Sequence, residues 1–429
     1  METIVIVGGG AGGLELATRL GDTLGAHRRA RIVLVDRSPG HFWKPLLHTV
    51  ASGKCDPQVS ELSFSAQARD HEFEFVHGEV LCVDRAHQTI TLAPRNGGDG
   101  ACRVLAYDKL VLALGSVTNF YNVPGAAEHA HTLDSVADAE AFRRRFIDTC
   151  VRAGERKAQV HVVIVGGGAT GVELAAELSN SARALADYRV HALDPEHDIR
   201  ITLIERGQYL LPQLHPQQAQ RAERHLRGLG IEVKTSTAIA CINHGEVTDA
   251  AGTDYPADLT LWAAGVEAPP LCTALGLATN RLKQIVVDAS LRSPEDPRIY
   301  AIGDCASYVC PVKGAAPPRA QVAHQQAMFL ADLLSRRDNQ DGSTGRLRAD
   351  FRYRDYGSLI SLGPQAAVGV LTGAITGKSV RVAGTTASVL YKLLYQKHLL
   401  QLHGATRMAA HTLADWLRSR VLPPVRLHR

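Results

Sequence analysis

The chain has 429 residues, of which 45% are hydrophobic and 21% are charged, a composition that excludes a disordered or low-complexity protein and suits two or three globular domains. The formal net charge of +4 is unevenly distributed, because residues 378–429 hold nine basic residues and one acidic residue and so carry +8, while residues 1–377 carry −4. An acidic body with a basic C-terminal segment argues against a protein that binds nucleic acid.

The first predicted element is a β-strand from Thr3 to Val7, followed by a glycine-rich turn and a helix, in the sequence TIVIVGGGAGGLELATRL. The turn contains Gly8-x-Gly10-x-x-Gly13, the fingerprint of a dinucleotide site. Its first glycine makes a tight turn, its second lets the backbone approach a pyrophosphate, and its third lets the helix and the strand pack closely. The next predicted strand ends on Asp36, an acid placed to bind a ribose 2′-hydroxyl.

Two further segments complete the first part of the chain. Residues Phe73–Leu92 predict a β-meander. The sequence YDKLVLALGS (Tyr107–Ser116) then predicts a strand that closes on Ala113-x-Gly115.

A second copy of the strand–turn–helix pattern begins 158 positions after the first, where residues 161–178 read HVVIVGGGATGVELAAEL and contain Gly166-x-Gly168-x-x-Gly171. This copy is also followed by a strand that ends on an acid, Glu205. Because a carboxylate there repels a 2′-phosphate, the sequence favours NADH over NADPH, although the adjacent Arg206 opposes that preference. The spacing is too long for a solenoid repeat and indicates two nucleotide-binding domains.

Glu173 has two interpretations. It follows Gly171 by two positions, in the first turn of the second dinucleotide helix, where the helix dipole stabilises an acid. Glu15 occupies the same offset in the first copy, which favours this structural interpretation. The alternative is a residue close to the reacting groups, and it depends on the family resemblance described below.

Two later segments again predict strands that end on glycine or an acid. The sequence LTLWAAGV (Leu259–Val266) closes on Ala263-x-Gly265, and IYAIGDCAS (Ile299–Ser307) places Asp304 after a strand and a glycine. The carboxyl end of a parallel sheet is the edge at which such sheets bind ligands. Asp304 is therefore a candidate ligand-binding residue; it can also serve as a helix N-cap.

The basic C-terminal segment predicts two helices. In residues 386–402 the apolar positions share one arc that also includes Lys397, whereas residues 405–422 separate an apolar face bearing Trp416 from a face bearing Arg407 and Arg418. Such a helix suits the interface of an anionic membrane. Packing against the protein core and dimerisation through the same face are the competing interpretations.

Taken together, these segments resemble the two-dinucleotide flavoproteins and, more closely, the bacterial type II NADH dehydrogenases, which are single-subunit NADH:quinone oxidoreductases that do not pump protons. The closer resemblance is carried by WKPLLHTVASG (Trp43–Gly53), PPRAQVAHQQA (Pro317–Ala327), GDCAS and YGSLISL (Tyr356–Leu362), and it runs along nearly the whole chain.

The resemblance implies an α/β fold with two Rossmann-like domains, non-covalent FAD near the first fingerprint, NADH near the second, and a membrane quinone as acceptor. It places Glu173 near the nicotinamide and the flavin, and Gln321 and Gln325 beside the quinone, where a glutamine amide can donate to a quinone oxygen. The expected cofactor-binding residues are Gly8, Gly10, Gly12, Gly13, Asp36, Lys44, Ala113, Gly115, Gly166, Gly168, Gly171, Glu205, Ala264, Gly265, Gly303, Asp304 and Ala320. No metal is expected, because the histidines form no ligand cluster.

The eight cysteines weigh against related activities. They contain no CxxC pair, and only Cys55 lies in the segment where disulfide reductases of this superfamily carry a redox-active pair. None follows Cys310, which counts against a sulfide:quinone reductase. Two alternatives stay open: a soluble NAD(P)H-dependent reductase of a ferredoxin or rubredoxin, and a non-catalytic NADH-sensing flavoprotein of the apoptosis-inducing-factor kind.

The predicted organisation has four parts: residues 1–117 begin an FAD domain, 118–278 form an NADH domain, 279–377 complete the FAD domain with the quinone pocket, and 378–429 hold the amphipathic helices. Scattered cysteines and the absence of a long apolar run indicate a reduced, intracellular protein without a spanning helix. With a lipid-confined quinone as acceptor, we expect a peripheral protein of the respiratory chain, on the cytoplasmic face of the bacterial inner membrane, held by residues 386–429.

Overall fold

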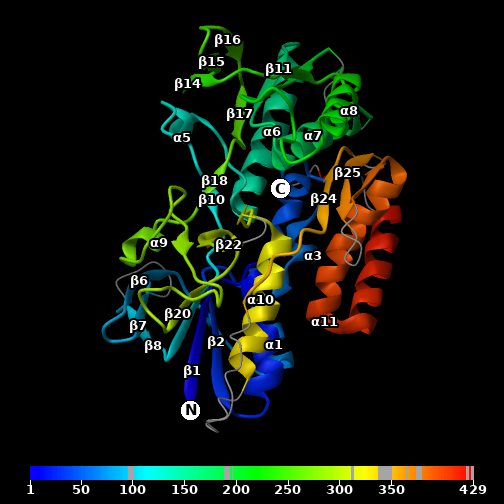
Figure 1. The fold of residues 1–429 in the computed structure, drawn as a ribbon. Coiled ribbons are helices and arrows are strands. Elements are labelled where there is room, and N and C mark those ends of the chain that lie inside the picture. The colour runs from blue at the N-terminus through cyan, green and yellow to red at the C-terminus, as the bar shows by residue number, and fades with distance from the viewer. Residues whose placement is uncertain are drawn as a thin grey trace. The chain divides into compact units, whose positions relative to one another are not determined.

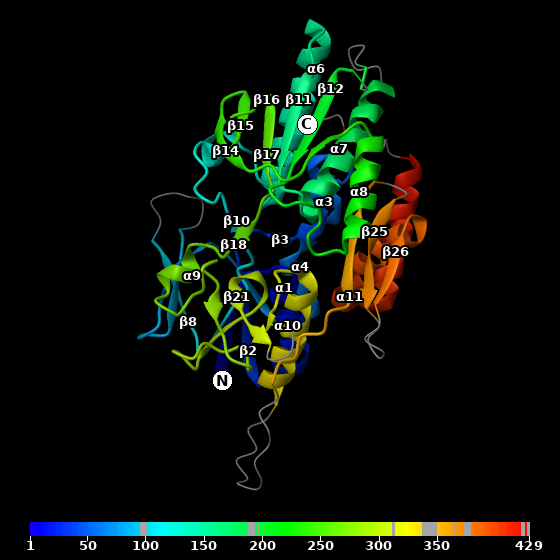
Figure 2. The same ribbon diagram turned by 45° about the horizontal axis from the view of Figure 1, so that its top comes forward.

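The structure is a computed structural model of the full chain, and it describes residues 1–94, 101–187, 194–195, 197–310, 314–336, 350–363, 366–372, 379–421 and 425–426. The chain forms two compact units, drawn as a ribbon in Figures 1 and 2. The first unit comprises Met1–Trp43, Glu61–Val117 and Val266–Arg354, and the second comprises Lys44–Ser60, Thr118–Gly265 and Asp355–Arg429.

The first unit is built on a five-stranded parallel sheet with the order β20-β9-β1-β2-β5. Its strands are rich in β-branched and aliphatic residues and are largely buried, as a parallel sheet covered on both faces requires. The strands are β1 (Glu2–Val7), β2 (Ala30–Asp36), β5 (Glu74–His77), β9 (Lys109–Leu112) and β20 (Ile299–Ala301).

Two helices of the first unit pack closely against each other. Helix α1 (Ala11–Leu20, blue in Figure 1) follows β1. Helix α10 (Ala320–Ser335, yellow) lies along α1, as both views show. A methyl group added at Gly12 would come within 3.2 Å of the Ala323 Cβ, so this glycine permits the close approach. The segment that carries Gln321 and Gln325 is therefore held against the first fingerprint helix.

The β-meander lies later in the chain than the sequence predicted. Residues Glu74–His77 join the parallel sheet as its edge strand β5, and the antiparallel meander consists of β6 (Val80–Asp84), β7 (Thr89–Leu92) and β8 (Arg103–Ala106). The prediction of Phe73–Leu92 was wrong at both ends, because local alternation does not reveal which partner a strand finds.

The shorter elements of the first unit connect these larger ones. They are a π-helical turn (Gly21–Gly25), β3 (Gly40–His41), β4 (Leu62–Ser63), α4 (Phe64–Asp70), α9 (Leu271–Ala274), β19 (Ile285–Val286), a 3₁₀ turn (Gly303–Cys305), β21 (Ala306–Ser307), β22 (Val309–Cys310) and β23 (Gly314–Ala315). Strands β10 (Val117–Thr118) and β18 (Val266–Glu267) lie where the chain passes from one unit to the other.

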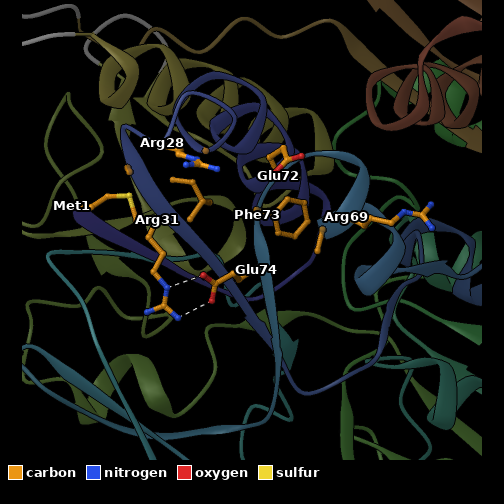
Figure 3. A pocket seen from close by; sticks show the side chains of 11 residues that line it. Met1, Arg28, Arg31, Arg69, Glu72, Phe73 and Glu74 are labelled. Atoms are coloured by element: carbon orange, nitrogen blue, oxygen red, sulfur yellow. Dashed lines mark hydrogen bonds and ion pairs between the residues drawn. The ribbon is translucent and has the colours of Figure 1, made fainter.

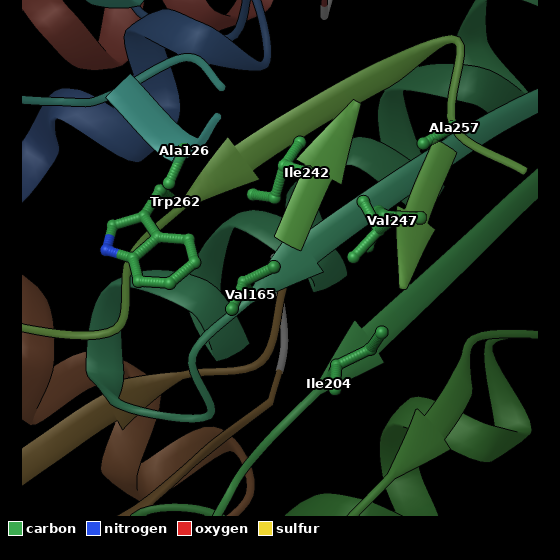
Figure 4. Packing of buried hydrophobic residues seen from close by; sticks show 8 residues of the cluster. Ala126, Val165, Ile204, Ile242, Val247, Ala257 and Trp262 are labelled. Carbon is green, nitrogen blue, oxygen red and sulfur yellow. The ribbon is translucent and has the colours of Figure 1, made fainter. Parts of the chain in front are cut away.

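The second unit repeats the architecture with a four-stranded parallel sheet in the order β13-β12-β11-β17. Its strands are β11 (Val160–Val165), β12 (Ile199–Ile204), β13 (Glu232–Lys234) and β17 (Leu259–Trp262). The antiparallel strands β14 (Ile239–Asn243), β15 (Glu246–Asp249) and β16 (Asp254–Pro256) pack on it. Trp262, Ile242 and Val247 form a buried cluster with their neighbours (Figure 4), and the Trp262 Nε1 donates to the Asn119 carbonyl at 2.8 Å.

The helical elements of the second unit before its C-terminal part come from residues Lys44–Ser60 and from the segments that precede or connect the strands of its sheet. They are a 3₁₀ turn (Lys44–Leu46), α2 (Leu47–Ala51), α3 (Pro57–Ser60), α5 (Ala126–His129), α6 (Val136–Arg156), α7 (Ala169–Asp187) and α8 (Pro216–Gly228). Helix α6 begins with a Ser135 cap, whose hydroxyl accepts from the Asp138 N–H.

The C-terminal part of the second unit is a three-stranded antiparallel sheet covered by helix α11 (Thr385–Val421). Its strands are β24 (Gly357–Ser361), β25 (Ala367–Thr372) and β26 (Ser379–Ala383), and α11 lies beside them in both views (orange and red in Figures 1 and 2). Gly404, with φ +72° and ψ 174°, breaks α11 into two helices, which correspond to the two predicted from the sequence.

The two Rossmann-like sheets confirm the predicted fold class. The division into units differs in detail from the four predicted parts. Residues 44–60 cluster with the second unit, the chain returns to the first unit at Val266 where 279 was predicted, and residues from Asp355 cluster with the second unit. The assignment of a cofactor to each part stays a prediction.

Candidate active site

The first fingerprint can only be made by glycine at two of its positions. Gly8 has φ +102°, and a Cβ there would lie 2.3 Å from the Ala113 carbonyl oxygen. A Cβ at Gly13 would lie 1.8 Å from the Gly8 oxygen. At Gly10 a Cβ would meet no atom within 4 Å, and no side chain caps the start of α1 at this residue. The turn is therefore closed by protein at its ends and open at its centre, where the N-terminus of α1 can receive an anion.

The second fingerprint has the same geometry. A Cβ at Gly166 (φ +114°) would lie 2.4 Å from the Ala263 oxygen, and one at Gly171 would lie 2.0 Å from the Gly166 oxygen. Gly168, like Gly10, faces open space. The predicted equivalence of the two copies is thus present in backbone detail.

The acid after each second strand closes onto its own glycine turn. One Asp36 oxygen accepts from the Gly9 N–H at 2.6 Å and the other from the Ser38 N–H at 2.7 Å. The Glu205 oxygens accept in the same way from the N–H groups of Gly167 and Gly207, each at 2.6 Å. Each carboxylate is therefore fixed in orientation at the carboxyl edge of its sheet.

Parallel register brings the other predicted residues of the first unit to the same edge. Val7 pairs with both Val35 and Leu112, and Leu112 pairs with Ala301, so the segments that follow these strands meet. There the Ser116 hydroxyl donates to an Asp304 oxygen at 2.9 Å. The Gln284 amide donates to the Asp304 carbonyl at 2.8 Å, which fixes the backbone of the Gly303–Cys305 turn.

One residue that supports this turn was not identified from the sequence. Gln326 is only 1% exposed, and its side-chain oxygen accepts from the Gly303 N–H at 2.7 Å. The spacing of buried residues along α10, at Val322, Ala323, Gln326 and Ala327, is the signal that could have identified it. For its neighbour Gln325, only the family resemblance predicts a role.

The two predicted quinone-binding glutamines lie in the first turns of α10. Ala320 is its first residue, and Gln321 and Gln325 are half-buried. The Gln325 amide nitrogen donates to the Arg354 carbonyl at 2.8 Å, and its oxygen accepts from the Arg354 N–H at 2.9 Å. In this structure the Gln325 amide therefore ties the 350–354 segment to α10.

Glu173 is a buried acid on α7, 6% exposed. One carboxyl oxygen accepts from the Ser361 N–H at 2.9 Å, and the other lies 3.5 Å from the His48 Nδ1. Burial, opposed by hydrogen bonds from Ser361 and Tyr391, raises the pKa of Glu173 to about 8. Burial and the nearby Lys54 lower the pKa of His48 to about 3, so at neutral pH the pair is largely uncharged.

Glu15, the equivalent acid in the first unit, has a different partner. It is 3% exposed, and its carboxylate lies 2.6 Å from the His324 Nδ1 on α10. Both acids are buried at the fifth residue of their helices, just beyond the first turn in which the sequence placed them. Lys44, a predicted cofactor-binding residue, is exposed at the start of a short turn in the second unit.

A hollow of about 440 Å³ lies in the first unit, away from the fingerprint of that unit. It is lined by Arg28, Arg31, Phe73 and Glu74 among others, at the amino ends of β1, β2 and β5 (Figure 3). Arg31 and Glu74 form a two-pronged ion pair there, with N–O distances of 2.8 and 2.7 Å. The hollow is thus at the opposite end of the strands from Asp36 and is not the dinucleotide site.

Both helices of α11 expose several large apolar side chains. Val389, Leu393, Leu394 and Leu400 are exposed on the first helix, and Leu413, Trp416, Leu417 and Val421 on the second. This exposure rules out the interpretation in which the whole apolar face of the helix pair packs into the protein core. Among the described residues, no helix is both long and apolar enough to span a bilayer.

Not all bases of the C-terminal segment face outward. Arg426 donates to Asp56 at 3.3 Å and to Glu140, and its N–H donates to the Gly53 carbonyl at 2.8 Å. Its carbonyl accepts from Arg143 at 3.2 Å. This base fastens the chain end to the second unit, so the +8 overstates the charge available to a partner.

Comparison with known proteins relates this geometry to a family. The family model described as pyridine nucleotide-disulphide oxidoreductase matches residues 2–327. A type II NADH:quinone oxidoreductase of Haemophilus influenzae is 36% identical over 100% of both chains, and a demethylphylloquinone reductase of Synechocystis is 29% identical over 97% of this chain and 98% of its own length. The solved structure of NDH2 from Plasmodium falciparum in complex with NADH has a TM-score of 0.83 with 20% identity and covers 100% of both chains.

The contrast between Gly10 and Gly13 gives a testable prediction. Gly13→Ala forces a Cβ into the Gly8 carbonyl and should lower the free energy of unfolding of the apoprotein by about 1–3 kcal/mol or more. Gly10→Ala meets no protein atom, so the apoprotein should unfold as the wild type does while retaining less bound flavin. Denaturant unfolding and the flavin content of the purified protein measure the two effects. Equal destabilisation of the apoprotein by both variants would contradict this.

Proposed function

The chain belongs to the pyridine nucleotide-disulphide oxidoreductases and, among them, to the type II NADH:quinone oxidoreductases, and we propose that its first unit holds FAD and its second unit holds NADH. The protein is a flavoprotein that oxidises NADH and reduces a quinone. FAD, when bound, supplies the two-electron chemistry that connects the two substrates. The observation that carries this function is the presence of two complete dinucleotide edges in one chain that aligns along its whole length with an enzyme of this activity.

The residues of the first unit fit a non-covalently bound FAD. The open space at Gly10, beside Gly12, together with the uncapped start of α1, suits a pyrophosphate. Asp36 is oriented at the position of a ribose-binding acid. Asp304, braced by Ser116 and by the Gln326–Gly303 bond, would bind the ribityl chain; Ala113, Gly115 and Ala320 line the same edge.

The residues of the second unit fit NADH. Gly168 leaves room for the pyrophosphate beside Gly166 and Gly171, and Glu205 presents a fixed carboxylate to the adenosine ribose. Ala264 and Gly265 continue the same edge after β17. The carboxylate repels a 2′-phosphate, which supports NADH as the donor.

The proton balance of the reaction suggests a role for Glu173. Oxidation of NADH by a quinone consumes one proton in addition to the hydride, since NADH + H⁺ + quinone gives NAD⁺ + quinol. Glu173 is largely protonated at neutral pH, because burial raises its pKa to about 8. We assign it the role of a buried acid that holds and exchanges a proton during turnover.

Gln321 and Gln325 are assigned to the quinone. Their amides lie in the first turns of α10, where Val322 and Ala323 supply small apolar side chains. The Gln325 amide nitrogen donates to the Gln321 carbonyl at 3.2 Å and to the Arg354 carbonyl at 2.8 Å, so it must exchange one of these bonds to donate to a quinone oxygen. Lys44 stays a proposed cofactor contact that rests on the resemblance alone.

We propose that α11 attaches the protein to an anionic lipid surface, the cytoplasmic side of the bacterial inner membrane; the exposed apolar side chains of α11 support the attachment. Leu413, Trp416 and Leu417 are each at least half exposed, and the Arg420 guanidinium lies 5.0 Å from the centre of the Trp416 ring. Apolar side chains beside arginines are the composition of helices that lie in a membrane interface. A homodimer through the same face is the competing proposal.

Anaerobic addition of NADH to the purified holoprotein should bleach its flavin absorption, and a soluble quinone should restore it. Each step follows from the assigned half-reaction, so a flavin that neither NADH bleaches nor quinone restores would contradict the function. Restoration by a ferredoxin, with quinone inactive, would identify the alternative reductase.

Replacement of Glu205 tests the choice of nicotinamide. The wild type should use NADH with a kcat/KM about tenfold or more above that for NADPH, and Glu205→Ser should narrow this ratio by removing the repulsive carboxylate. Glu232→Ser, which removes an exposed acid from the neighbouring strand β13, is the matched control and should leave the ratio unchanged. A wild type that prefers NADPH would overturn the assignment.

The membrane proposal is tested on exposed side chains, because α11 also contributes buried residues such as Ala387, Leu399 and Leu402 to the fold. The triple variant Leu413→Ser, Trp416→Ser and Leu417→Ser should reduce co-sedimentation with vesicles containing anionic phospholipid by about tenfold or more, with flavin retained. The control triple variant Leu81→Ser, Val104→Ser and Val309→Ser alters equally exposed residues of the first unit and should bind as the wild type does. Unchanged vesicle binding of the α11 variant with loss of a dimer would favour the competing proposal.

A further inference from the structure

Three segments of the second unit that are distant in the sequence from one another contact the buried acid Glu173. His48 comes from α2, Ser361 from the end of β24 and Tyr391 from the first helix of α11, while Glu173 itself lies on α7. The proposed function uses the Glu173 carboxyl but gives no role to Tyr391. The C-terminal helix thus contributes a polar group to the interior as well as an apolar surface to the outside.

The Glu173 carboxyl receives two hydrogen bonds from neutral donors. The Ser361 N–H donates at 2.9 Å, and the Tyr391 hydroxyl donates to the same carboxyl. The Ser361 donor belongs to the backbone of β24 and is fixed by the sheet. Tyr391 is therefore the one of these two donors that a side-chain substitution can remove without altering the sheet.

Apart from Tyr391, none of the charged and titratable groups described around Glu173 stabilises its carboxylate form. His48 is neutral because its pKa is lowered to about 3, Glu177 on the next turn of α7 repels a negative charge, and Lys54 is engaged with Glu177 at 2.7 Å. The carboxylate form of Glu173 thus has no adjacent countercharge among the described residues. Its stability depends on the donors from Ser361 and Tyr391.

The position of Tyr391 is itself well defined. It packs with Leu390 against the buried residues Leu359, Ala367 and Ala387. Six residues after Tyr391, the Lys397 ammonium lies 5.8 Å from the centre of the Tyr356 ring and holds the same helix to the sheet. Lys392, Leu393 and Leu394, which follow Tyr391 directly, are exposed. The helix is therefore oriented with Tyr391 inward and Leu393 and Leu394 outward.

We propose that Tyr391 is a positioning residue for the reaction: its hydroxyl orients the Glu173 carboxyl and tunes its affinity for the proton that it exchanges during turnover. This inference rests on the role proposed for Glu173. The step itself is a proton transfer, in which the Glu173 O–H bond breaks as its proton passes to the quinone being reduced and re-forms as a proton from water returns, with no change in the oxidation state of Glu173. Tyr391 keeps its own proton throughout, because burial and the adjacent acid raise its pKa well above the ordinary value.

The test is the alkaline limb of the pH profile for NADH oxidation by a soluble quinone. The protonated form of Glu173 is the active one, so the wild-type rate should fall as pH rises through the pKa of this acid, near 8. Tyr391→Phe removes a donor that favours the carboxylate, which should raise that pKa and move the limb about one unit towards higher pH. Tyr395→Phe, one turn along the same helix, is the matched control and should leave the limb in place.

Glu173→Gln separates a failure of this inference from a failure of the proposed role. If the glutamine variant keeps the limb, Glu173 does not cause it and the role falls together with the inference. Suppose instead that Glu173→Gln abolishes the alkaline limb. The positioning role alone is then overturned if Tyr391→Phe leaves the limb of the wild type in place. It is also overturned if Tyr391→Phe and Tyr395→Phe shift the limb equally. Flavin content and melting temperature establish that each variant is folded.

If Tyr391→Phe does not fold, site-specific fluorotyrosine at position 391 provides a second measurement. A fluorinated phenol is a stronger donor, so it should stabilise the carboxylate and move the limb towards lower pH. An unmoved limb with fluorotyrosine at position 391 would overturn the inference.

Discussion

The close approach of backbone to backbone at the carboxyl ends of β1 and β11 is the constraint on which both nucleotide sites depend. A carbonyl oxygen lies 2.3 Å from where Gly8 would place a Cβ and 2.4 Å from where Gly166 would place one, so no other residue fits without moving the next strand. Closing the turn in this way aims the N-terminus of the following helix at open space. Asp36 and Glu205 then accept from the turn itself and are held at the ribose position.

The two units share this construction and diverge at the fifth residue of the fingerprint helix. In the first unit Glu15 pairs with His324 and so joins α1 to the helix that bears Gln321 and Gln325. In the second unit Glu173 faces neutral donors and an uncharged histidine, and burial raises its pKa to about 8. The same position in a duplicated motif thus makes an interhelical hydrogen bond in one copy and is a buried acid with a raised pKa in the other, because different segments pack against it.

The C-terminal segment combines several physical roles. Several of its large apolar side chains are exposed, Tyr391 points inward to Glu173, and Arg426 binds Asp56, Glu140 and the Gly53 carbonyl. A segment that served only to bind lipid would not need the contacts of Tyr391 and Arg426. The exposed apolar face and the buried hydroxyl belong to the same helix, so its attachment to the sheet defines both.

The sequence by itself determined the features that arise from short-range order. Glycine spacing, β-branched runs and the acids that end strands predicted both dinucleotide motifs, the strands of the two parallel sheets other than β5 and β13, and the break between two C-terminal helices, because each depends on residues close in the chain. The tertiary structure decided the rest. It put Glu74–His77 into the parallel sheet and the meander later, found Gln326 as the buried partner of Gly303, and turned Gln325 to Arg354. It also brought His48, Ser361 and Tyr391 around Glu173, where burial and long-range partners, which no local pattern encodes, set the charge of that acid.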